Sequence, residues 1–150
     1  MATVCVDHPA SFNDASNRLI DKMNQRISAS DKFFSLEFFP PRTASGACNL
    51  FEKCNRLSQG APLFCDVSCD VSKTDSVDEH RFIDVASTTQ DITQVDTAIQ
   101  LNSSQVTEDA VLEILYKARR LGLSNIMAVS DSKSCLFFVI YHVIVQPPAP

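Results

Sequence analysis

The sequence predicts an α/β fold in which three or four β/α units follow one another along the chain. Short apolar runs of strand length recur at 33–39, 63–67 and 95–101, and stretches with apolar residues at helical spacing separate them. Two apolar strands joined by a helical crossover imply a parallel βαβ unit with a right-handed connection. This order favours a doubly wound sheet or a piece of a (β/α)8 barrel.

The first elements are a helix and a strand with a sharp end. Asn13 or Asp14 could cap the helix, whose apolar face comprises Ala15, Leu19, Ile20, Met23 and Ile27. The strand at 33–39 stops at Pro40-Pro41, because proline has no amide donor for the hydrogen-bond ladder.

A second helix and strand follow, and then a weaker pattern. The helix carries Ala47, Leu50, Phe51, Cys54 and Leu57 at helical spacing and ends at Gln59-Gly60-Ala61-Pro62. The buried strand covers Leu63 to Val67. Between Ser68 and Thr93 the sequence is more polar, with Val77, Phe82, Ile83 and Val85 as contacts of a further helix.

The last β/α unit has the clearest helix signals. After the strand at 95–101, Thr107 is a plausible N-cap, acidic residues follow it, and Gly122 sits where a left-handed residue ends a helix. The apolar stripe of this helix comprises Val106, Ala110, Val111, Ile114, Leu115, Ala118 and Leu121. Ile126 to Val129 makes a fourth strand.

Composition narrows the class of protein. The chain has 150 residues, 45% of them hydrophobic and 21% charged, with a net charge of -5 and no basic cluster beyond Arg119-Arg120, which argues against a nucleic-acid partner. Neither the start of the chain nor the apolar run 135–145 has the pattern of a signal peptide or a membrane span. We therefore expect a soluble cytoplasmic protein without a membrane partner.

The cysteines, glycines and histidines exclude several kinds of site. The six cysteines contain no C-x-x-C pair and no zinc-finger spacing, so we expect reduced, mostly buried thiols and no metal site. The three glycines form no phosphate-binding motif. His8, His80 and His142 are too scattered to argue for a catalytic triad.

Glu37 is the candidate catalytic residue that the strand pattern itself selects. Alternation places Ser35 and Glu37 on one face of the strand at 33–39 and Phe34, Leu36 and Phe38 on the other. The two prolines put Glu37 near the carboxyl end of the strand, where parallel α/β folds build active sites and where burial raises the pKa of a glutamate toward that of a general acid. The alternative is a glutamate that points to solvent from an edge strand.

Five segments resemble methylenetetrahydrofolate reductase in its eukaryotic form. The longest is F-F-S-L-E-F-F-P-P-R-T within Lys32 to Thr43. The others are Asn49-Leu50, Gly60-Ala61-Pro62-Leu63, Asp66-Val67-Ser68 and the stretch A-R-R-L-G-L-S-N-I-M-A at 118–128. The resemblance implies a flavoprotein with a (β/α)8 TIM barrel, of which residues 32–132 are the first three to four β/α units.

The resemblance also implies a reaction. The family uses FAD to pass a hydride from NADPH or NADH to 5,10-methylenetetrahydrofolate, giving 5-methyltetrahydrofolate for methionine synthesis. Opening of the folate's five-membered ring requires a proton at N10, and Glu37 matches the family's general acid. A homodimer or an association with a full-length reductase is the implied assembly.

The residues that contact the flavin in the family are only partly retained in this sequence. Ser68 keeps the hydroxyl of the family's D-V-T motif, which contacts the flavin phosphates. Gln100 and Asn102 replace a flavin-contacting histidine and a threonine. Where the family has L-R-G-D-P, this chain has Val129-Ser130-Asp131-Ser132, so Asp131 stands one residue before the position of the aspartate that lies near the flavin N1.

Both ends of the chain lie outside the resemblance. We expect residues 1–31 to form an extension with one helix and residues 133–150 to be an unrelated apolar and proline-rich tail. Three hypotheses follow: a reductase, a truncated non-catalytic product that no longer binds FAD and associates with a full-length subunit, and a small independent α/β binding domain. The third requires the tail to form a fifth strand of the sheet.

Overall fold

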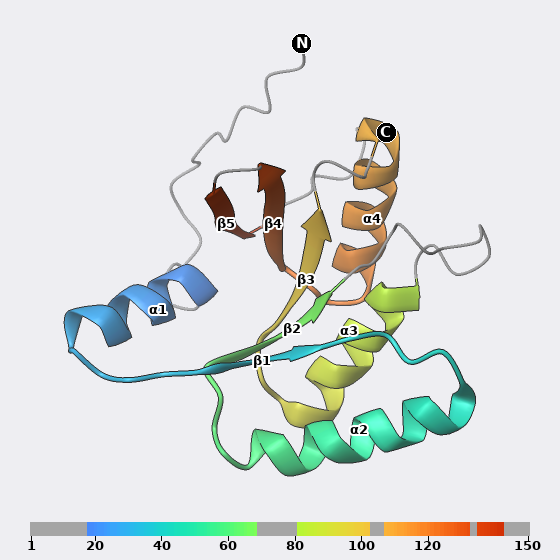
Figure 1. The fold of residues 1–150 in the computed structure, drawn as a ribbon, viewed down its shortest axis with the longest axis horizontal. Coiled ribbons are helices and arrows are strands. Elements are labelled where there is room, and N and C mark those ends of the chain that lie inside the picture. The colour runs from blue at the N-terminus through green and yellow to red at the C-terminus, as the bar shows by residue number, and fades with distance from the viewer. Residues whose placement is uncertain (1–17, 69–80, 103–106, 133–134, 143–150) are drawn as a thin grey trace.

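A computed structural model of the chain describes residues 18–68, 81–102, 107–132 and 135–142 (Figure 1). The helices are α1 (Leu19–Ser28), α2 (Ala44–Ser58), α3 (Arg81–Thr93) and α4 (Glu108–Arg120). The strands are β1 (Ser35–Phe38), β2 (Phe64–Ser68), β3 (Thr97–Asn102), β4 (Asn125–Ser132) and β5 (Cys135–His142). Every predicted β/α unit is therefore present, and the proposed caps at Asn13 and Asp14 lie outside the described residues.

The strands form one sheet in the order β1-β2-β3-β4-β5. The first four are parallel to one another, and each pairs with the next strand of the sequence. This confirms the predicted parallel βαβ units. The strand order alone does not distinguish an open sheet from a barrel, because the positions of the helices decide that question.

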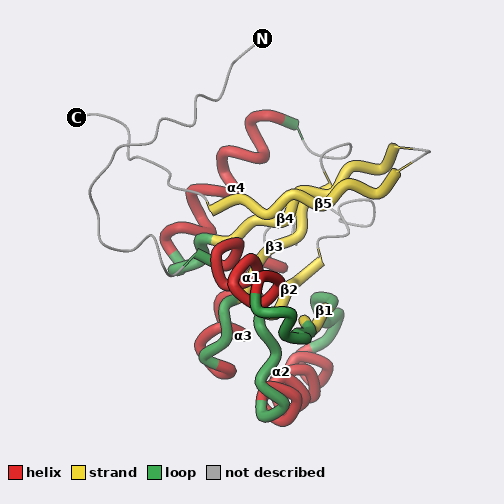
Figure 2. The backbone as a smooth tube through the Cα atoms, turned by 90° about the vertical axis from the view of Figure 1, so that its left-hand side faces the viewer, coloured by secondary structure: helices red, strands yellow, loops and turns green. Residues whose placement is uncertain are grey.

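The three crossover helices all cover the same face of the sheet (Figures 1 and 2). Their buried side chains share one hydrophobic cluster with those of the strands, which includes Cys54 of α2, Ile83 of α3 and Ile114 of α4 together with Val67 and Ile99 of the sheet. A doubly wound sheet would have helices on both faces. Sequential parallel strands with their helices on one side are instead the arrangement of part of a (β/α)8 barrel.

Helix α1 lies on the opposite face of the sheet from these three helices (Figures 1 and 2). Leu19, which is 1% exposed, packs with Phe64, Met127 and Val129 in a second, smaller cluster. One turn later on α1 lies Lys22, which pairs with Asp96. The predicted apolar stripe of α1 is wrong at its far end, since Ile27 is 61% exposed.

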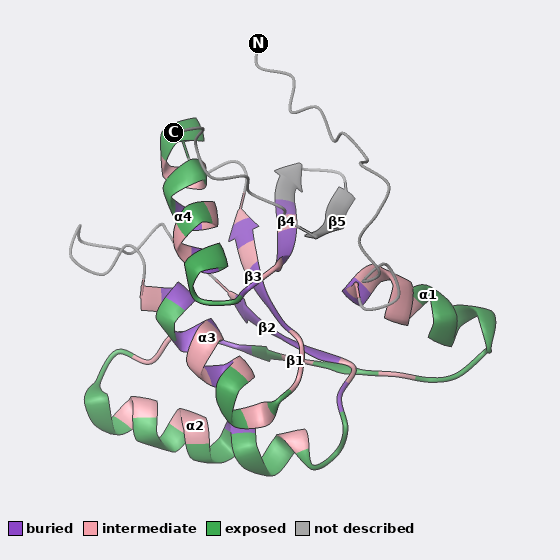
Figure 3. Ribbon diagram, turned by 180° about the vertical axis from the view of Figure 1, so that it is seen from behind, coloured by how far each residue is buried: buried purple, intermediate pink, exposed green. Residues whose placement is uncertain are grey.

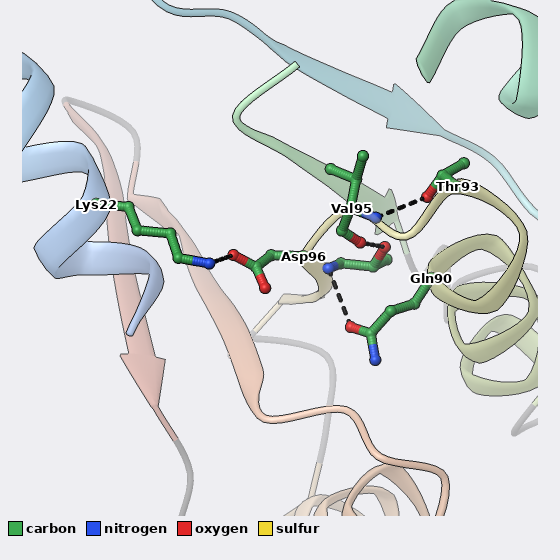
Figure 4. Close-up of polar contacts among 6 residues, drawn as sticks. Lys22, Gln90, Thr93, Val95 and Asp96 are labelled. Atoms are coloured by element: carbon green, nitrogen blue, oxygen red, sulfur yellow. Dashed lines mark hydrogen bonds and ion pairs between the residues drawn. The ribbon is translucent and has the colours of Figure 1, made fainter. Parts of the chain in front are cut away.

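An ion pair joins α1 to the segment that enters β3. The Lys22 ammonium donates to the Asp96 carboxylate at 2.5 Å (Figure 4). Next to it, Gln90 accepts a hydrogen bond from the Thr97 amide through its side-chain oxygen, and Thr93 accepts one from the Val95 amide. These contacts hold the amino end of β3 between α1 and α3.

The helix ends follow the sequence signals. The Thr107 hydroxyl accepts from the Ala110 amide at 3.3 Å, which confirms it as the N-cap of α4. Gly122 has a φ of 77°, the left-handed conformation predicted after that helix. Thr43 caps α2 in the same way as Thr107, by accepting from the Gly46 amide.

Strand β5 comes from the segment that was expected to be an unrelated tail. It pairs antiparallel with β4 over the full length of both strands, from Asn125 opposite His142 to Ser132 opposite Cys135. β4 is accordingly longer than the predicted run Ile126 to Val129. The fifth strand that the binding-domain hypothesis requires is therefore present, and it occupies the edge of β4 where a barrel would place its next parallel strand.

Candidate functional site

The face of β1–β4 that lies opposite α2, α3 and α4 carries most of the predicted site residues, and we name it the polar face. Side chains alternate between the two faces of a strand. Leu36 and Phe38 point to the helix side, where Phe38 is buried in the main cluster. Glu37 therefore belongs to the polar face, as predicted, and lies next to the last residue of β1.

The structure corrects the expected burial of Glu37. Its side chain is exposed, and β1 as a whole is mostly exposed or half-buried (Figure 3). The reason is the position of β1 at the edge of the sheet, because α1 packs over Phe64 of β2 and over β4 instead. The alternative of a glutamate pointing to solvent from an edge strand describes this structure.

The buried carboxyl group of the polar face is Asp66. It is the register partner of Glu37 on the neighbouring strand β2 and only 5% exposed. Burial, and then the negative charge of Glu37, raise the pKa of Asp66 from 3.8 to about 6. The two carboxyl groups thus stand side by side, with their backbones about 4.8 Å apart, the usual spacing of paired strands.

Three further predicted residues lie on the polar face beyond this pair. Ser68 is the last residue of β2 and the register partner of Gln100. Asn102 is the last residue of β3. All three side chains are half-buried. Their backbones are held in strands, and the side chains can still be reached by a ligand from solvent. The structure thus brings Glu37, Ser68, Gln100 and Asn102 to the carboxyl ends of three adjacent strands.

Asp131 lies in β4, two residues beyond Val129, which is the register partner of Asn102. Its side chain is outside the described part of the structure. The role of Asp131 therefore stays a prediction.

Asp66 was missed as a site residue, although a signal for it exists. The sequence Phe64-Cys65-Asp66-Val67 places a carboxylate inside an apolar strand, which is the same signal that selected Glu37. The burial of Asp66 could not be predicted from the sequence, because it depends on which strands have a neighbouring strand on both sides. β2 lies between β1 and β3, whereas β1 is an edge strand.

Other kinds of site find no support in the described part of the chain. Within it, no three His, Cys, Asp or Glu side chains come together to hold a metal ion, and none of its helices is long and apolar enough to cross a membrane. Cys54 and Cys65 are buried free thiols, as predicted, whereas Cys48 is exposed. Burial is the main cause that raises the pKa of Cys65 to about 12.

Comparison with known proteins identifies the family. The model of the methylenetetrahydrofolate reductase family matches residues 22–133, a range that stops before β5. The chain is 33% identical over 126 residues, or 81% of its length, to a Caenorhabditis elegans protein named probable methylenetetrahydrofolate reductase (NADPH). It is 29% identical over 112 residues, or 75% of its length, to methylenetetrahydrofolate reductase (NADH) 1 of Arabidopsis thaliana.

The similarity covers a small part of these relatives. The chain spans 18% of the length of both the nematode and the plant protein. Within that span, three crossover helices connect four parallel strands and cover one face of the sheet, which is the architecture of part of a (β/α)8 barrel. The matched range and the fold together show that this chain belongs to the methylenetetrahydrofolate reductase family.

Proposed function

We propose that the polar face is the folate-reducing site of a methylenetetrahydrofolate reductase that takes its hydride from NADPH or NADH. The observation that supports this proposal most is the position of Glu37. It lies at the carboxyl end of a parallel strand, on the face opposite the helices and beside other polar side chains, where barrel enzymes place their catalytic groups. The two nicotinamide nucleotides are those that appear in the relatives' names.

The residues at the ends of β2 and β3 fit a flavin cofactor. Ser68 offers a hydroxyl group, and Gln100 and Asn102 offer amide groups, all half-buried on the same face. Such groups donate hydrogen bonds to ring and phosphate oxygens and accept hydrogen bonds from ring N–H groups. FAD, when bound, supplies the hydride chemistry, and we propose Ser68, Gln100, Asn102 and Asp131 as the residues that hold it.

The role of Glu37 in this proposal is to donate a proton. Opening the folate's five-membered ring breaks a carbon–nitrogen bond, and the nitrogen needs a proton as the bond breaks. Glu37 in its acid form gives that proton, and its O–H electron pair remains on the carboxylate. General acid catalysis of this kind contributes roughly 10²- to 10⁴-fold to a rate.

A non-catalytic binding role is the second candidate, and β5 is the observation that favours it. β5 lies beyond the range matched by the family model and occupies the outer edge of β4. Strands of a barrel pair only with parallel neighbours, so β5 would have to leave this edge before a further parallel strand could pair there. While β5 stays paired with β4, an association with a full-length reductase would have to use a surface other than this edge of the sheet.

The visible spectrum of the purified chain separates the two functions. The reductase proposal expects a yellow protein whose bound flavin bleaches when NADPH or NADH is added. A double variant, Ser68→Ala with Gln100→Ala, should lose the flavin, whereas Glu52→Gln on the exposed side of α2 should keep it. A folded, colourless chain that takes up no FAD would contradict the reductase proposal and favour the binding role.

A further inference from the structure

Phe39 directly follows β1 and is the most exposed large apolar side chain among the described residues. Its side chain is 63% exposed, and within the described part of the chain it belongs to neither of the two hydrophobic clusters. Single exposed apolar residues are common on protein surfaces. The position of this ring, two residues after the proposed proton donor, is what distinguishes it.

The backbone directs Phe39 to the polar face. Phe38, the residue before it, is 8% exposed and packs in the main cluster on the helix side. Pro40 comes next, and a residue that precedes proline is held in the extended region. Successive side chains of an extended chain point to opposite sides, so Phe39 points to the same side as Glu37.

Phe39 lies beyond Glu37 in the direction of the carboxyl ends of the strands. Phe38 is the register partner of Val67, so Phe39 follows at the level of Ser68, the last residue of β2. Glu37 precedes Phe39 by two residues, a distance of about 7 Å along an extended strand. An exposed aromatic ring therefore lies next to the proposed proton donor, on the side from which a ligand reaches the polar face.

The chemistry of the proposed substrate places an aromatic ring at the atom that receives the proton. The folate nitrogen N10 is bonded directly to the aminobenzoyl ring, which is flat and apolar. We propose that Phe39 binds this aminobenzoyl ring by stacking against it and so holds N10 within reach of Glu37. The inference rests on the proposed function. Contact between two aromatic rings contributes affinity beyond the area that it buries.

Phe34 provides a matched control, because it is a second exposed phenylalanine in the same segment and points elsewhere. Its side chain is 47% exposed. Its Cζ atom lies 3.4 Å from the position that a Cβ atom on Gly60 would take, and Gly60 comes shortly after the end of α2. The ring of Phe34 thus lies at the end of α2, away from the polar face.

The binding of two ligands to the 150-residue chain, in the presence of FAD, tests the stacking contact. Isothermal titration calorimetry measures the Kd of 5-methyltetrahydrofolate and that of 6-methyltetrahydropterin, which has the reduced pterin but no aminobenzoyl ring. Phe39→Leu keeps an apolar side chain and removes the ring, so the Kd of the folate should rise about three- to tenfold, while the Kd of the pterin should stay the same. Phe39→Tyr and Phe34→Leu should bind the folate like wild type.

Two results would overturn the inference while leaving the proposed function intact. One is a Phe39→Leu chain that binds the folate as tightly as wild type does. The other is an equal loss of affinity for both ligands, which would indicate that Phe39 only maintains the local structure. A wild-type chain that binds neither ligand would contradict the proposed function, and the inference would fall with it.

Discussion

Asp66 and Glu37 occupy the same register position on adjacent strands, yet only Asp66 is buried. Two neighbouring carboxyl groups of one protein thus have different solvent access because one strand is central and the other is at the edge. The difference has a consequence for stability that is independent of any reaction.

The stability of the chain should fall as pH rises from about 4 to about 6. In this window the unfolded chain has lost the proton of Asp66, while the folded chain still holds it, because burial raises the pKa of Asp66 to about 6. The contribution of the Asp66 proton to the free energy of unfolding is present in full below about pH 4 and is lost above pH 6. Its size is up to about 3 kcal/mol. Urea unfolding between pH 4 and 7 measures it.

Asp66→Asn is the matched variant for this prediction. It should flatten the pH dependence over that window and make the chain more stable than wild type at pH 7. A wild-type curve that rises between pH 4 and 6, and that the variant leaves unchanged, would show that other carboxyl groups dominate.

Leu19 should be the residue that fixes α1 to the polar face. Leu19 is 1% exposed and packs with Phe64, Met127 and Val129, so Leu19→Ala should lower the free energy of unfolding by about 2–4 kcal/mol. Ile27→Ala, on the same helix but 61% exposed, should change it by less than about 0.5 kcal/mol. Equal effects of the two variants in urea unfolding would contradict the packing of α1.

The thiols should differ in reactivity according to their burial. Cys48 is exposed and should react with a maleimide in the native chain. Cys54 and Cys65 should react only after denaturation, since both are buried and burial raises the pKa of each thiol. Peptide mapping by mass spectrometry assigns the modified sites. Rapid modification of Cys65 under native conditions would contradict its place between β1 and β3.

The pairing of β5 with β4 should protect backbone amides in both strands. Val139 is the register partner of Ala128, and Val139→Pro should disturb the pairing, because proline fixes φ and has no amide donor. We expect slow hydrogen exchange along β5 in wild type and faster exchange of β4 in the variant. Fast exchange of β5 in wild type would contradict the antiparallel edge.

Local signals in the sequence predicted local structure well. Thr107 and Gly122 mark the ends of α4 through cap geometry that depends on their own neighbours. The alternation of side chains around Glu37 correctly predicted which residues of β1 lie on each face of the sheet, because it too depends on adjacent residues. The family resemblance added the barrel, which the pattern of strands and helices had left open beside a doubly wound sheet.

Properties that depend on distant parts of the chain were not predictable in the same way. The exposure of Glu37 follows from the edge position of β1, and the burial of Asp66 follows from strands on both of its sides. The place of β5 depends on its pairing with β4, which an apolar run does not specify by itself. Each of these is a tertiary property.

The proton donated by Glu37 is the central claim, and one comparison tests it most directly. Wild type and Glu37→Gln, loaded with equal amounts of FAD, are mixed with methylenetetrahydrofolate and NADPH or NADH, and the formation of methyltetrahydrofolate is followed. We predict a fall of about 10²-fold or more in Glu37→Gln, with no change in Glu52→Gln. A Glu37→Gln protein that reduces folate at the wild-type rate would contradict the assignment.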